Sequence, residues 1–384
     1  MKKIQMVDLK SQYEKIKTEI DTGIQEVIDN TQFIKGPQIK VFENALAEEL
    51  NVKHVISCAN GTDALQVAMM ALNLKPGDEV ILPVFTYVAT AEVIALLGLV
   101  PIMVDVNTDT FCIDTNLIEA KISTKTKAIV PVHLFGQCAN MDEVMRIANK
   151  YQLYVIEDTA QAIGADYQLN DGSASTVKTR KAGTMGHIGT TSFFPSKNLG
   201  CYGDGGALMT NDDELAHKIR IICNHGQSVQ YVHDVIGVNS RLDSIQAAIL
   251  NAKLPHLKDY EKARNAAASW YDELLANHSN IVIPKRDSKS SHVFHQYTIK
   301  LLGVNRDALR LALADKGIPS MVYYPIELHK QKAFEQYNKS GENFPVSAEL
   351  CQTVLSLPMH TELSRDTVEY IAREVIASVN ALKQ

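Results

Sequence analysis

The sequence predicts an α/β fold with a mostly parallel sheet in a large domain and a smaller α+β domain at the C-terminal end. From about residue 54, short apolar runs alternate with stretches in which apolar residues recur at helical spacing, an order typical of βαβ units. Near residue 255 this alternation gives way to a long amphipathic helix. The chain has 384 residues and 46% hydrophobic content, which is enough for two such domains.

In the large domain, predicted strands and helices alternate. We expect buried strands over 79–83, 101–106, 128–134 and 153–158, because each run is apolar and bounded by turn residues or charges. We expect helices over 62–74, 88–98 and 140–151, where apolar residues repeat at helical spacing. This order predicts helices on both faces of the sheet and ligands at the carboxyl ends of the strands.

The predicted boundary between the domains divides the chain into residues 1–255 and 256–384. The second part begins with the long helix over 256–278, followed by a polar loop over 286–291. Its further expected elements are a strand over 295–302, a helix over 305–317, the segment 320–326 and a last helix over 365–383. The first 50 residues carry a helix without a core of their own, so we expect them to pack on one of the domains.

The composition is that of an ordinary globular protein. The 38 Lys and Arg residues against 44 Asp and Glu residues leave a net charge of −6, so there is no basic excess for nucleic-acid binding. The six cysteines are dispersed without a CxxC pair, which indicates free thiols in a reducing compartment and no metal site. A charged N-terminus and the lack of any apolar run of about 18 residues predict a cytoplasmic protein that does not enter a membrane.

Lys197 lies between the aromatic, strand-like run SFFPS and the glycine-rich segment GCYGDGG. A P-loop is excluded because the residues directly before the lysine, SFFPS, contain no glycine. A dinucleotide fingerprint is excluded because the glycines after the lysine lead into another strand. Two interpretations stay open: a solvated surface lysine, or a lysine whose desolvation lowers its pKa and makes it a Schiff-base nucleophile. The flanking Phe193, Phe194 and Pro195 favour the second.

A Schiff-base lysine requires a carbonyl cofactor, and pyridoxal phosphate (PLP) makes demands that the sequence can be checked for. PLP needs a carboxylate for its pyridinium nitrogen, a site for its phosphate and an aromatic ring over its own ring. Asp158 directly follows a predicted strand, so its carboxylate is expected at the strand's carboxyl end; a turn or helix cap is the alternative. Gln161 is placed to bond the ring hydroxyl or to make an ordinary polar contact.

The segment SCANGTDALQVA (57–68) is the predicted phosphate site, because a glycine-containing turn opens a helix there. Free backbone N–H groups and the helix dipole suit a phosphate, with Gly61 and Thr62 leading the site. Plain helix capping by Asn60 or Thr62 is the alternative. Ser192, five residues before Lys197, is a further candidate donor to the phosphate.

Two aromatic residues, Phe85 and Tyr87, follow the strand over 79–83 at the depth where a stacking ring is needed. Core packing is the alternative for both. No single position is decisive, but their joint order is informative. The turn at 60–62, Tyr87, Asp158 and Lys197 together are similar to fold type I PLP enzymes.

A narrower resemblance rests on longer segments. ANGTDAL, FTYVATAE, IEDTAQAIGA, SFFPSKNLGCYGDGGA and GVNSRLDSIQAAIL resemble the DegT/DnrJ/EryC1/StrS family of nucleotide-sugar aminotransferases. The resemblance covers nearly the whole chain, and its lysine-containing segment is specific to the family. It implies a fold type I enzyme with a seven-stranded type of sheet, PLP and its amino form PMP as cofactor, and L-glutamate as amino donor.

The resemblance also implies a role for each candidate residue. Lys197 would hold the cofactor covalently and carry protons, Asp158 would pair with the pyridinium nitrogen, and Gln161 would contact the ring oxygen. The stacking aromatic matches Tyr87, and the phosphate ligands match Gly61, Thr62 and Ser192. Asn239, the asparagine of GxNxRLD, would reach the cofactor phosphate of a partner subunit, which implies a homodimer with shared sites. Sugar dehydratases of the family carry histidine at the lysine position, so Lys197 argues for amino transfer.

The substrate implied most closely is a UDP-linked 2-acetamido-3-keto-hexuronic acid, aminated at C3 for surface polysaccharides such as lipopolysaccharide O-antigen. Arg241 and Tyr324 match substrate-contacting positions of the enzymes that act on it. Tyr323 replaces the histidine of their HYPI motif, which leaves a neutral 6-deoxy or TDP-linked 3- or 4-keto-sugar open. Basic residues of the loop 168–186 are expected either to meet the nucleotide diphosphate or to be solvated.

Two other classes of protein stay open at this point. One is a regulatory protein that binds PLP without turnover, and the other is a structural dimer that uses SRLDSIQAAIL as its interface. Glutamate separates the first from an enzyme, because only an enzyme would convert the cofactor to its amino form. A colourless preparation without cofactor would support the second.

Overall fold

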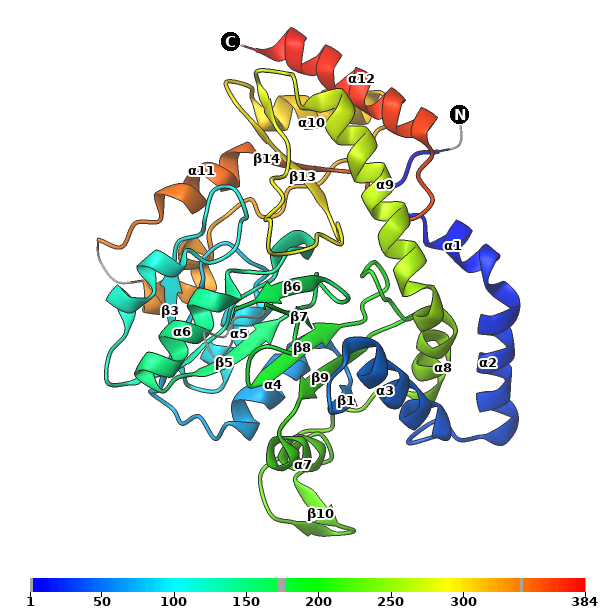
Figure 1. The fold of residues 1–384 in the computed structure, drawn as a ribbon, viewed down its shortest axis with the longest axis vertical. Helices are drawn as coiled ribbons and strands as arrows, with labels where there is room; N and C mark the ends of the chain where they lie inside the picture. Colours follow the sequence, from blue (N-terminus) through cyan, green and yellow to red (C-terminus); the bar gives the residue numbers. More distant parts are fainter. Residues whose placement is uncertain (1–2, 171–176, 339–340, 384) are drawn as a thin grey trace.

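A seven-stranded sheet forms the centre of the molecule (Figure 1). The computed structural model describes residues 3–170, 177–338 and 341–383. The strand order is β1-β9-β8-β5-β4-β2-β3, and β9 alone runs antiparallel to its neighbours β1 and β8. The predicted mostly parallel sheet is therefore confirmed. The strands are β1 (His54–Cys58), β2 (Glu79–Pro83), β3 (Val100–Val104), β4 (Thr126–Ile129), β5 (Tyr154–Asp158), β8 (Ile188–Ser192) and β9 (Gly206–Thr210).

The strands predicted in the large domain overlap β2, β3, β4 and β5, and the observed β2 coincides with the predicted 79–83. The prediction over 128–134 was too long, since β4 ends at Ile129. Pro131 has no backbone N–H to donate to the sheet, so regular pairing stops before it. Each strand of this group is buried over its last residues, which places its carboxyl end inside the molecule.

Helices cover the sheet. The large-domain helices are α4 (Gly61–Ala71), α5 (Ala89–Leu96), α6 (Met141–Tyr151), α7 (Asp213–Ile222) and α8 (Ser244–Lys253). Of these, α4, α5 and α6 each begin within one residue of the predicted start. Asn60 caps α4 and Asn140 caps α6, each through a side-chain oxygen that accepts from a backbone N–H of the first turn. The first 50 residues form three helices rather than one: α1 (Leu9–Lys15), α2 (Lys17–Asn30) and α3 (Pro37–Leu50). Both α2 and α3 pack against α8 (Figure 1).

The C-terminal part has a three-stranded antiparallel sheet of its own. Its strands are β12 (Ile281–Val282), β13 (Tyr297–Leu301) and β14 (Val354–Leu357), and its helices are α9 (Leu257–Leu275), α10 (Arg306–Asp315), α11 (Pro345–Thr353) and α12 (Arg365–Leu382). The helices predicted over 256–278, 305–317 and 365–383 are confirmed. The segment 320–326 is not a strand; within it, Met321 makes a single antiparallel bridge to Ser356 of β14.

The buried side chains cross the predicted boundary at residue 255. Leu328, Phe334 and Phe344 pack with residues of α4, β2 and α5 in the core of the large sheet. Ile4, at the other end of the chain, packs against the C-terminal core that includes Tyr271 and Tyr297. The two halves therefore share core residues, and the boundary at 255 stays a prediction.

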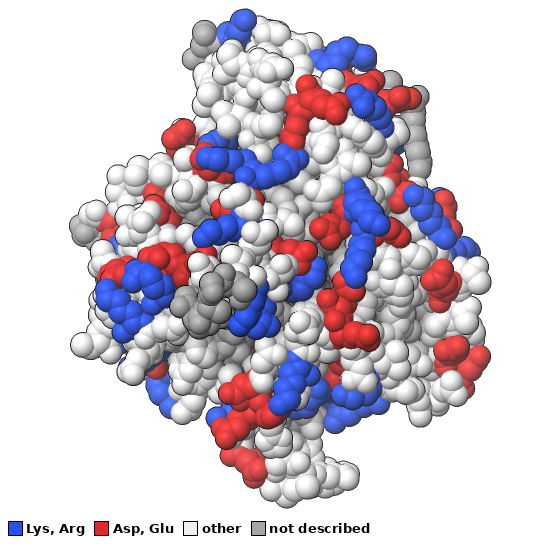
Figure 2. Space-filling view, viewed as in Figure 1, with Lys and Arg blue, Asp and Glu red and all other residues white. Residues whose placement is uncertain are grey.

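Basic and acidic side chains are mixed over the face that Figure 2 shows. Two further strand pairs are β6 (Asp166–Leu169) with β7 (Lys178–Lys181), which packs on the main body through the buried Tyr167, and β10 (Gln227–Val229) with β11 (Val232–His233). The hairpin of β10 and β11 projects from the lower end in Figure 1. Together with the residues after it, it exposes large apolar side chains, including Tyr231 and Ile236.

In the described ranges no helix is long and apolar enough to cross a bilayer.

Candidate active site

A cavity of about 550 Å³ opens at the carboxyl ends of β5 and β8 and at the first turn of α4. This is the position at which a parallel sheet is expected to bind a ligand. The cavity brings together nine of the residues predicted to form the site: Gly61, Thr62, Tyr87, Asp158, Gln161, Ser192, Lys197, Tyr323 and Tyr324. They come from segments up to 263 positions apart (324 − 61).

Lys197 lies in the turn that follows β8, and its neighbours hold the backbone of that turn firmly. The Cys201 N–H donates to the Phe193 carbonyl at 2.8 Å, and the buried Lys253 amine donates to the Gly200 carbonyl at 2.7 Å. Within the described chain, the Lys197 amine itself has no hydrogen bond or ion pair. Burial lowers the pKa of Lys197 to about 8, although the Asp158 carboxylate opposes that effect. Lys197 is half-buried and lines the cavity, which favours the interpretation as a desolvated amine.

Asp158 ends β5 with its carboxylate in a fixed orientation. One oxygen accepts from the Thr90 hydroxyl of α5 at 2.9 Å, and the other accepts from the Ala160 backbone N–H at 3.1 Å. The side chain is 7% exposed and lines the cavity. A buried carboxylate with only these two partners in the described chain keeps accepting capacity for a cationic group in the cavity.

Glu157, the residue before Asp158, also fixes the end of β5. Its fully buried carboxylate accepts from three backbone N–H groups of segment 183–186 at 2.6 to 2.9 Å, and from His133 Nε2 at 3.0 Å. His133 Nδ1 accepts from the Ala139 N–H at 3.1 Å, so the proton of the imidazole lies on Nε2. These bonds fix the strand end that carries Asp158.

The first turn of α4 offers free donors to the cavity. Asn60 caps the helix through the Asp63 N–H at 2.8 Å, so the predicted capping does occur. The N–H groups of Gly61 and Thr62 have no acceptor in the part of the chain that the structure describes. Ser192 of β8 lies beside them; a Cβ on Gly61 would come within 2.7 Å of the Ser192 Cβ. Backbone donors at a helix N-terminus beside a hydroxyl are a suitable environment for a phosphate.

The opposite wall consists of polar and aromatic side chains. Gln161 accepts from the Phe135 N–H at 2.7 Å and donates to the Tyr324 hydroxyl at 3.2 Å. The Tyr87 and Tyr324 rings lie 6.3 Å apart, and Tyr87 is 58% exposed within the cavity. Phe85 is buried in the core, so the core-packing alternative holds for Phe85 and not for Tyr87. Tyr323 lines the cavity next to Tyr324.

Several cavity residues were not predicted, among them Thr86, His295 and Gln296. His295 is 6% exposed, its Nδ1 has no partner in the described structure, and burial together with the Lys197 charge moves its pKa well below 6.5. The segment that carries it is held by Asn198, which donates to the Val293 carbonyl at 2.9 Å. A histidine before strand β13 has no local motif, so only the tertiary fold reveals that it belongs to the site.

Two predicted residues lie elsewhere. Asn239 pairs with Asn224 in an antiparallel bridge, and Arg241 lines a separate pocket, so neither contributes to the cavity of its own chain. In the loop 168–186, residues 171–176 lie outside the described residues. Lys178 and Arg180 are part of β7, and Lys181 pairs with Asp166 at 2.9 Å, away from the residues that line the cavity.

Comparison with known proteins agrees with this site. The chain is 46% identical to UDP-2-acetamido-2-deoxy-3-oxo-D-glucuronate aminotransferase of Pseudomonas aeruginosa, and the alignment covers 96% of this chain and 98% of that protein. UDP-N-acetyl-3-dehydro-alpha-D-glucosamine 3-aminotransferase of Acidithiobacillus ferrooxidans is also 46% identical, over 96% of both chains.

A solved structure supports the fold independently. The crystal structure of NtdA from Bacillus subtilis with bound cofactor PMP superposes with a TM-score of 0.87 at 32% identity, covering 98% of this chain and 83% of that one. The model of the DegT/DnrJ/EryC1/StrS aminotransferase family matches residues 14–376. The match spans the helix before β1, the Lys197 turn and most of α12. The chain therefore belongs to the DegT/DnrJ/EryC1/StrS aminotransferase family.

Proposed function

We propose that this protein is a PLP-dependent aminotransferase that moves the amino group of L-glutamate onto C3 of a UDP-linked 2-acetamido-3-keto-sugar. One observation carries the proposal. A lysine with a free amine and a pKa of about 8 shares a cavity with an oriented carboxylate and with the N-terminus of a helix. A surface charge or a purely structural lysine would require none of these neighbours.

The residues of the cavity fit PLP. Asp158 has free accepting capacity for the pyridinium nitrogen, and the α4 amides with Ser192 suit the phosphate. Tyr87 exposes its ring to the cavity, as a stacking partner must. The buried Thr86 hydroxyl, which has no partner within the described residues, adds one more donor.

The chain's own groups would then do the following work. PLP, when bound, supplies an electron sink and the carbonyl that receives the amino group. The neutral Lys197 amine would be the general base that accepts the proton of the donor's α-carbon, and its protonated form would be the general acid that gives the proton back. Asp158 holds a positive charge on the ring nitrogen, and Gln161 keeps the ring oxygen and the Tyr324 hydroxyl in place.

The choice of sugar rests on the names of two relatives and on Tyr323, which stands where the HYPI motif has a histidine. Both relatives at 46% identity are named for UDP-linked sugars with a C3 carbonyl, one a glucuronate and one a glucosamine derivative. We take the hexuronic acid as the first candidate. Tyr323 supports the second, a sugar without the C6 carboxylate, because its phenol is uncharged at neutral pH, whereas the histidine that it replaces can carry a positive charge. A TDP- or UDP-linked 6-deoxy 3- or 4-keto-sugar is the third candidate. We also propose Arg241 and Tyr324 as residues that contact the substrate.

We also propose a cytoplasmic homodimer with shared sites that supplies surface polysaccharides such as O-antigen. All six cysteines are free, as expected in a reducing compartment. Asn239 lies outside the cavity of its own chain, which fits a role in the partner's site. The exposed Tyr231 and Ile236 give the hairpin an apolar surface suited to contact with a second subunit.

Lys197→Ala tests the function directly. We expect the wild-type protein to be yellow and to lose its long-wavelength band when L-glutamate is added, and the variant to lack that band and all turnover. The variant should still bind PLP noncovalently, which equilibrium dialysis would show. Full turnover by Lys197→Ala with glutamate and a keto-sugar nucleotide would disprove the assignment. A wild-type band that glutamate leaves unchanged would instead favour the PLP-binding regulatory protein.

A further inference from the structure

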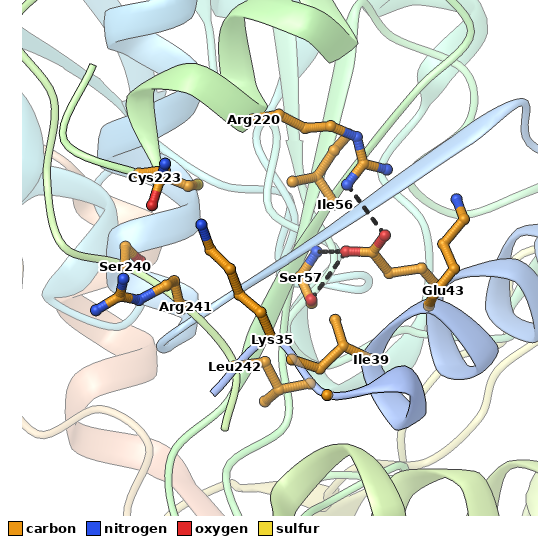
Figure 3. A pocket seen from close by; sticks show the side chains of 13 residues that line it. Lys35, Ile39, Glu43, Ile56, Ser57, Arg220, Cys223, Ser240, Arg241 and Leu242 are labelled. Atoms are coloured by element: carbon orange, nitrogen blue, oxygen red, sulfur yellow. Dashed lines mark hydrogen bonds and ion pairs between the residues drawn. The ribbon is translucent and has the colours of Figure 1, made fainter. Parts of the chain in front are cut away.

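A buried arginine of helix α9 has no acidic partner. Arg264 is 3% exposed, and no carboxylate of the described chain pairs with it. Burial lowers the pKa of its guanidinium to about 10, which still leaves it cationic at neutral pH. By contrast, Arg220, whose side chain is 42% exposed, pairs with Glu43 at 3.0 Å (Figure 3). A charge buried without a counter-ion costs stability, which indicates that Arg264 has another role.

The Arg264 guanidinium binds backbone carbonyls, two of them directly before strand β13. Its Nη1 donates to the Phe294 carbonyl at 2.9 Å and, over longer distances, to the carbonyls of His295 and Met359 at 3.4 and 3.3 Å. Phe294 has a φ of +45°, in the left-handed region that a residue other than glycine adopts at a cost in free energy. The arginine therefore stabilises a strained backbone at this point.

Two asparagines hold the same segment. Asn265 of α9 donates to the His292 carbonyl at 3.0 Å, and Asn198, in the turn that follows β8, donates to the Val293 carbonyl at 2.9 Å. With the two carbonyls bound by the arginine, every backbone carbonyl of residues 292–295 accepts from a side chain. The segment is thus fixed from α9 on one side and from the turn of the reactive lysine on the other.

The residue that this segment brings to the cavity is His295. Its imidazole is 6% exposed and lines the cavity, and its Nδ1 has no partner in the described structure. Gln296 Nε2 donates to His295 Nε2 at 3.4 Å, because an amide NH₂ group can only donate. Burial holds the pKa of the imidazole well below 6.5, so the ring is neutral and its proton lies on Nδ1. His295 therefore has an N–H donor without an acceptor among the described residues.

The charges around His295 favour an anionic ligand. Two cations, Lys197 and Arg264, act on its imidazole, and no carboxylate of the described chain does. An N–H donor beside two cations suits a carboxylate oxygen. In the proposed reaction the α-carbon of L-glutamate gives its proton to the Lys197 amine, so the α-carboxylate on that carbon must lie beside the lysine. The ring oxygen of PLP has the same chemistry, and a ligand without an α-carboxylate separates the two.

We propose that His295 binds the α-carboxylate of the amino donor, and that Arg264 is a positioning residue that holds His295 in the cavity. The identity of the ligand rests on the proposed function, whereas the fixed position of His295 follows from the hydrogen bonds of its segment. A 3-keto-sugar has no carboxylate on its reacting carbon. His295 is therefore a contact for the first half of the reaction and not for the second.

Absorbance titration of the PLP-loaded protein with two amines tests the proposal. 2-Methyl-L-glutamate keeps the α-carboxylate but lacks the α-proton, so it binds without reacting further, whereas 4-aminobutyrate keeps the amine and lacks the α-carboxylate. We expect His295→Phe to weaken the binding of 2-methyl-L-glutamate about tenfold or more and to leave that of 4-aminobutyrate unchanged. Arg264→Met should act in the same direction, and Arg264→Lys, which keeps a cation and a donor, should restore part of the affinity.

Three further variants make the comparison specific. His295→Asn keeps a side-chain N–H donor and should retain most of the affinity for 2-methyl-L-glutamate. His217→Phe changes an exposed histidine of α7 outside the cavity and should bind both amines as the wild type does. If the phenyl ring at position 295 prevents folding, His295→Ala gives the same comparison.

Three outcomes would overturn the proposal. The first is unchanged affinity for 2-methyl-L-glutamate in a folded His295→Phe or His295→Ala protein. The second is an equal loss of affinity for both amines, or for PLP itself in equilibrium dialysis, which would assign the imidazole to the cofactor. The third is wild-type affinity in Arg264→Met, which would remove the positioning role. The failure of the proposed function is visible separately, because the wild-type protein would then keep its long-wavelength band with glutamate.

Discussion

At the scale of single residues, the reactive state of Lys197 results from burial. The pKa of a lysine is usually near 10.5, and desolvation in the cavity lowers it to about 8 in spite of the nearby Asp158 charge. At pH 7 roughly a tenth of such amines are neutral, against fewer than about one in a thousand for a solvated lysine. The folded protein thus supplies a nucleophile at neutral pH without a second base to deprotonate it.

The pH dependence of cofactor capture checks this state. In cofactor-free protein, the rate at which added PLP produces the long-wavelength band should rise with pH up to about 8 and then level off, because the neutral amine is the reacting form. Stopped-flow absorbance between pH 6 and 10.5 measures it. Burial also lowers the pKa of Lys253 to about 8, so Lys197→Ala is the control and should show no band at any pH. A rate that keeps rising to pH 10 would contradict the lowered pKa.

At the scale of elements, most of the fold was predictable and part of the site was not. The strand that ends at Asp158 and the helix that begins at Gly61 follow from apolar periodicity, whereas β8, which carries Ser192 and precedes Lys197, was not among the predicted strands. His295 and Thr86 have no periodic or motif signal, and their presence in the cavity depends on long-range packing. The segment 320–326 has strand-like composition, but it makes only one bridge to β14.

At Gly61, helix α4 approaches strand β8 closely. Gly61→Ala would place a methyl group 2.7 Å from the Ser192 Cβ, so the helix must shift away from the strand and the phosphate donors with it. We expect PLP affinity to fall about tenfold or more and the thermal midpoint of the holoprotein to drop. Fluorescence titration with PLP and differential scanning calorimetry measure these effects.

Gly23→Ala is the matched control for that change. Gly23 lies inside α2, where a Cβ would meet the Ala248 Cβ at an ordinary 3.4 Å. This variant should retain wild-type PLP affinity and gain roughly 0.5–1 kcal/mol of stability, because alanine is the better helix former. Equal PLP affinity in the two variants would show that the approach of α4 to β8 does not control the phosphate site.

At the scale of the whole molecule, the cavity of one chain contains the predicted lysine and carboxylate but not Asn239 or Arg241. The proposed homodimer with shared sites would account for this arrangement. In a symmetric dimer, each site would combine Lys197 of one subunit with Asn239 of the other. In a mixed dimer, with Lys197 changed in one subunit and Asn239 changed in the other, both changes fall in the same site. The second site then has both native residues.

Mixing two variants tests the shared site. Lys197→Ala should be inactive, and Asn239→Ala should bind PLP weakly and have little activity. When the two are unfolded together and refolded, half the dimers are mixed and each contains one intact site, so about a quarter of wild-type activity should return. Steady-state turnover and light scattering would be measured on the same sample. Mixed dimers without regained activity would place Asn239 in the site of its own chain or outside the site.

The wide separation of the cavity residues along the chain has a consequence for biosynthesis. Gly61 lies near the beginning of the chain, while His295 and Tyr324 belong to the C-terminal part, yet they line one cavity. A ribosome adds roughly 5–20 residues per second, so a nascent chain spends many seconds without these two residues. The cofactor therefore cannot stabilise early folding stages through the complete site, and PLP binding should be a late event that secures a nearly finished fold.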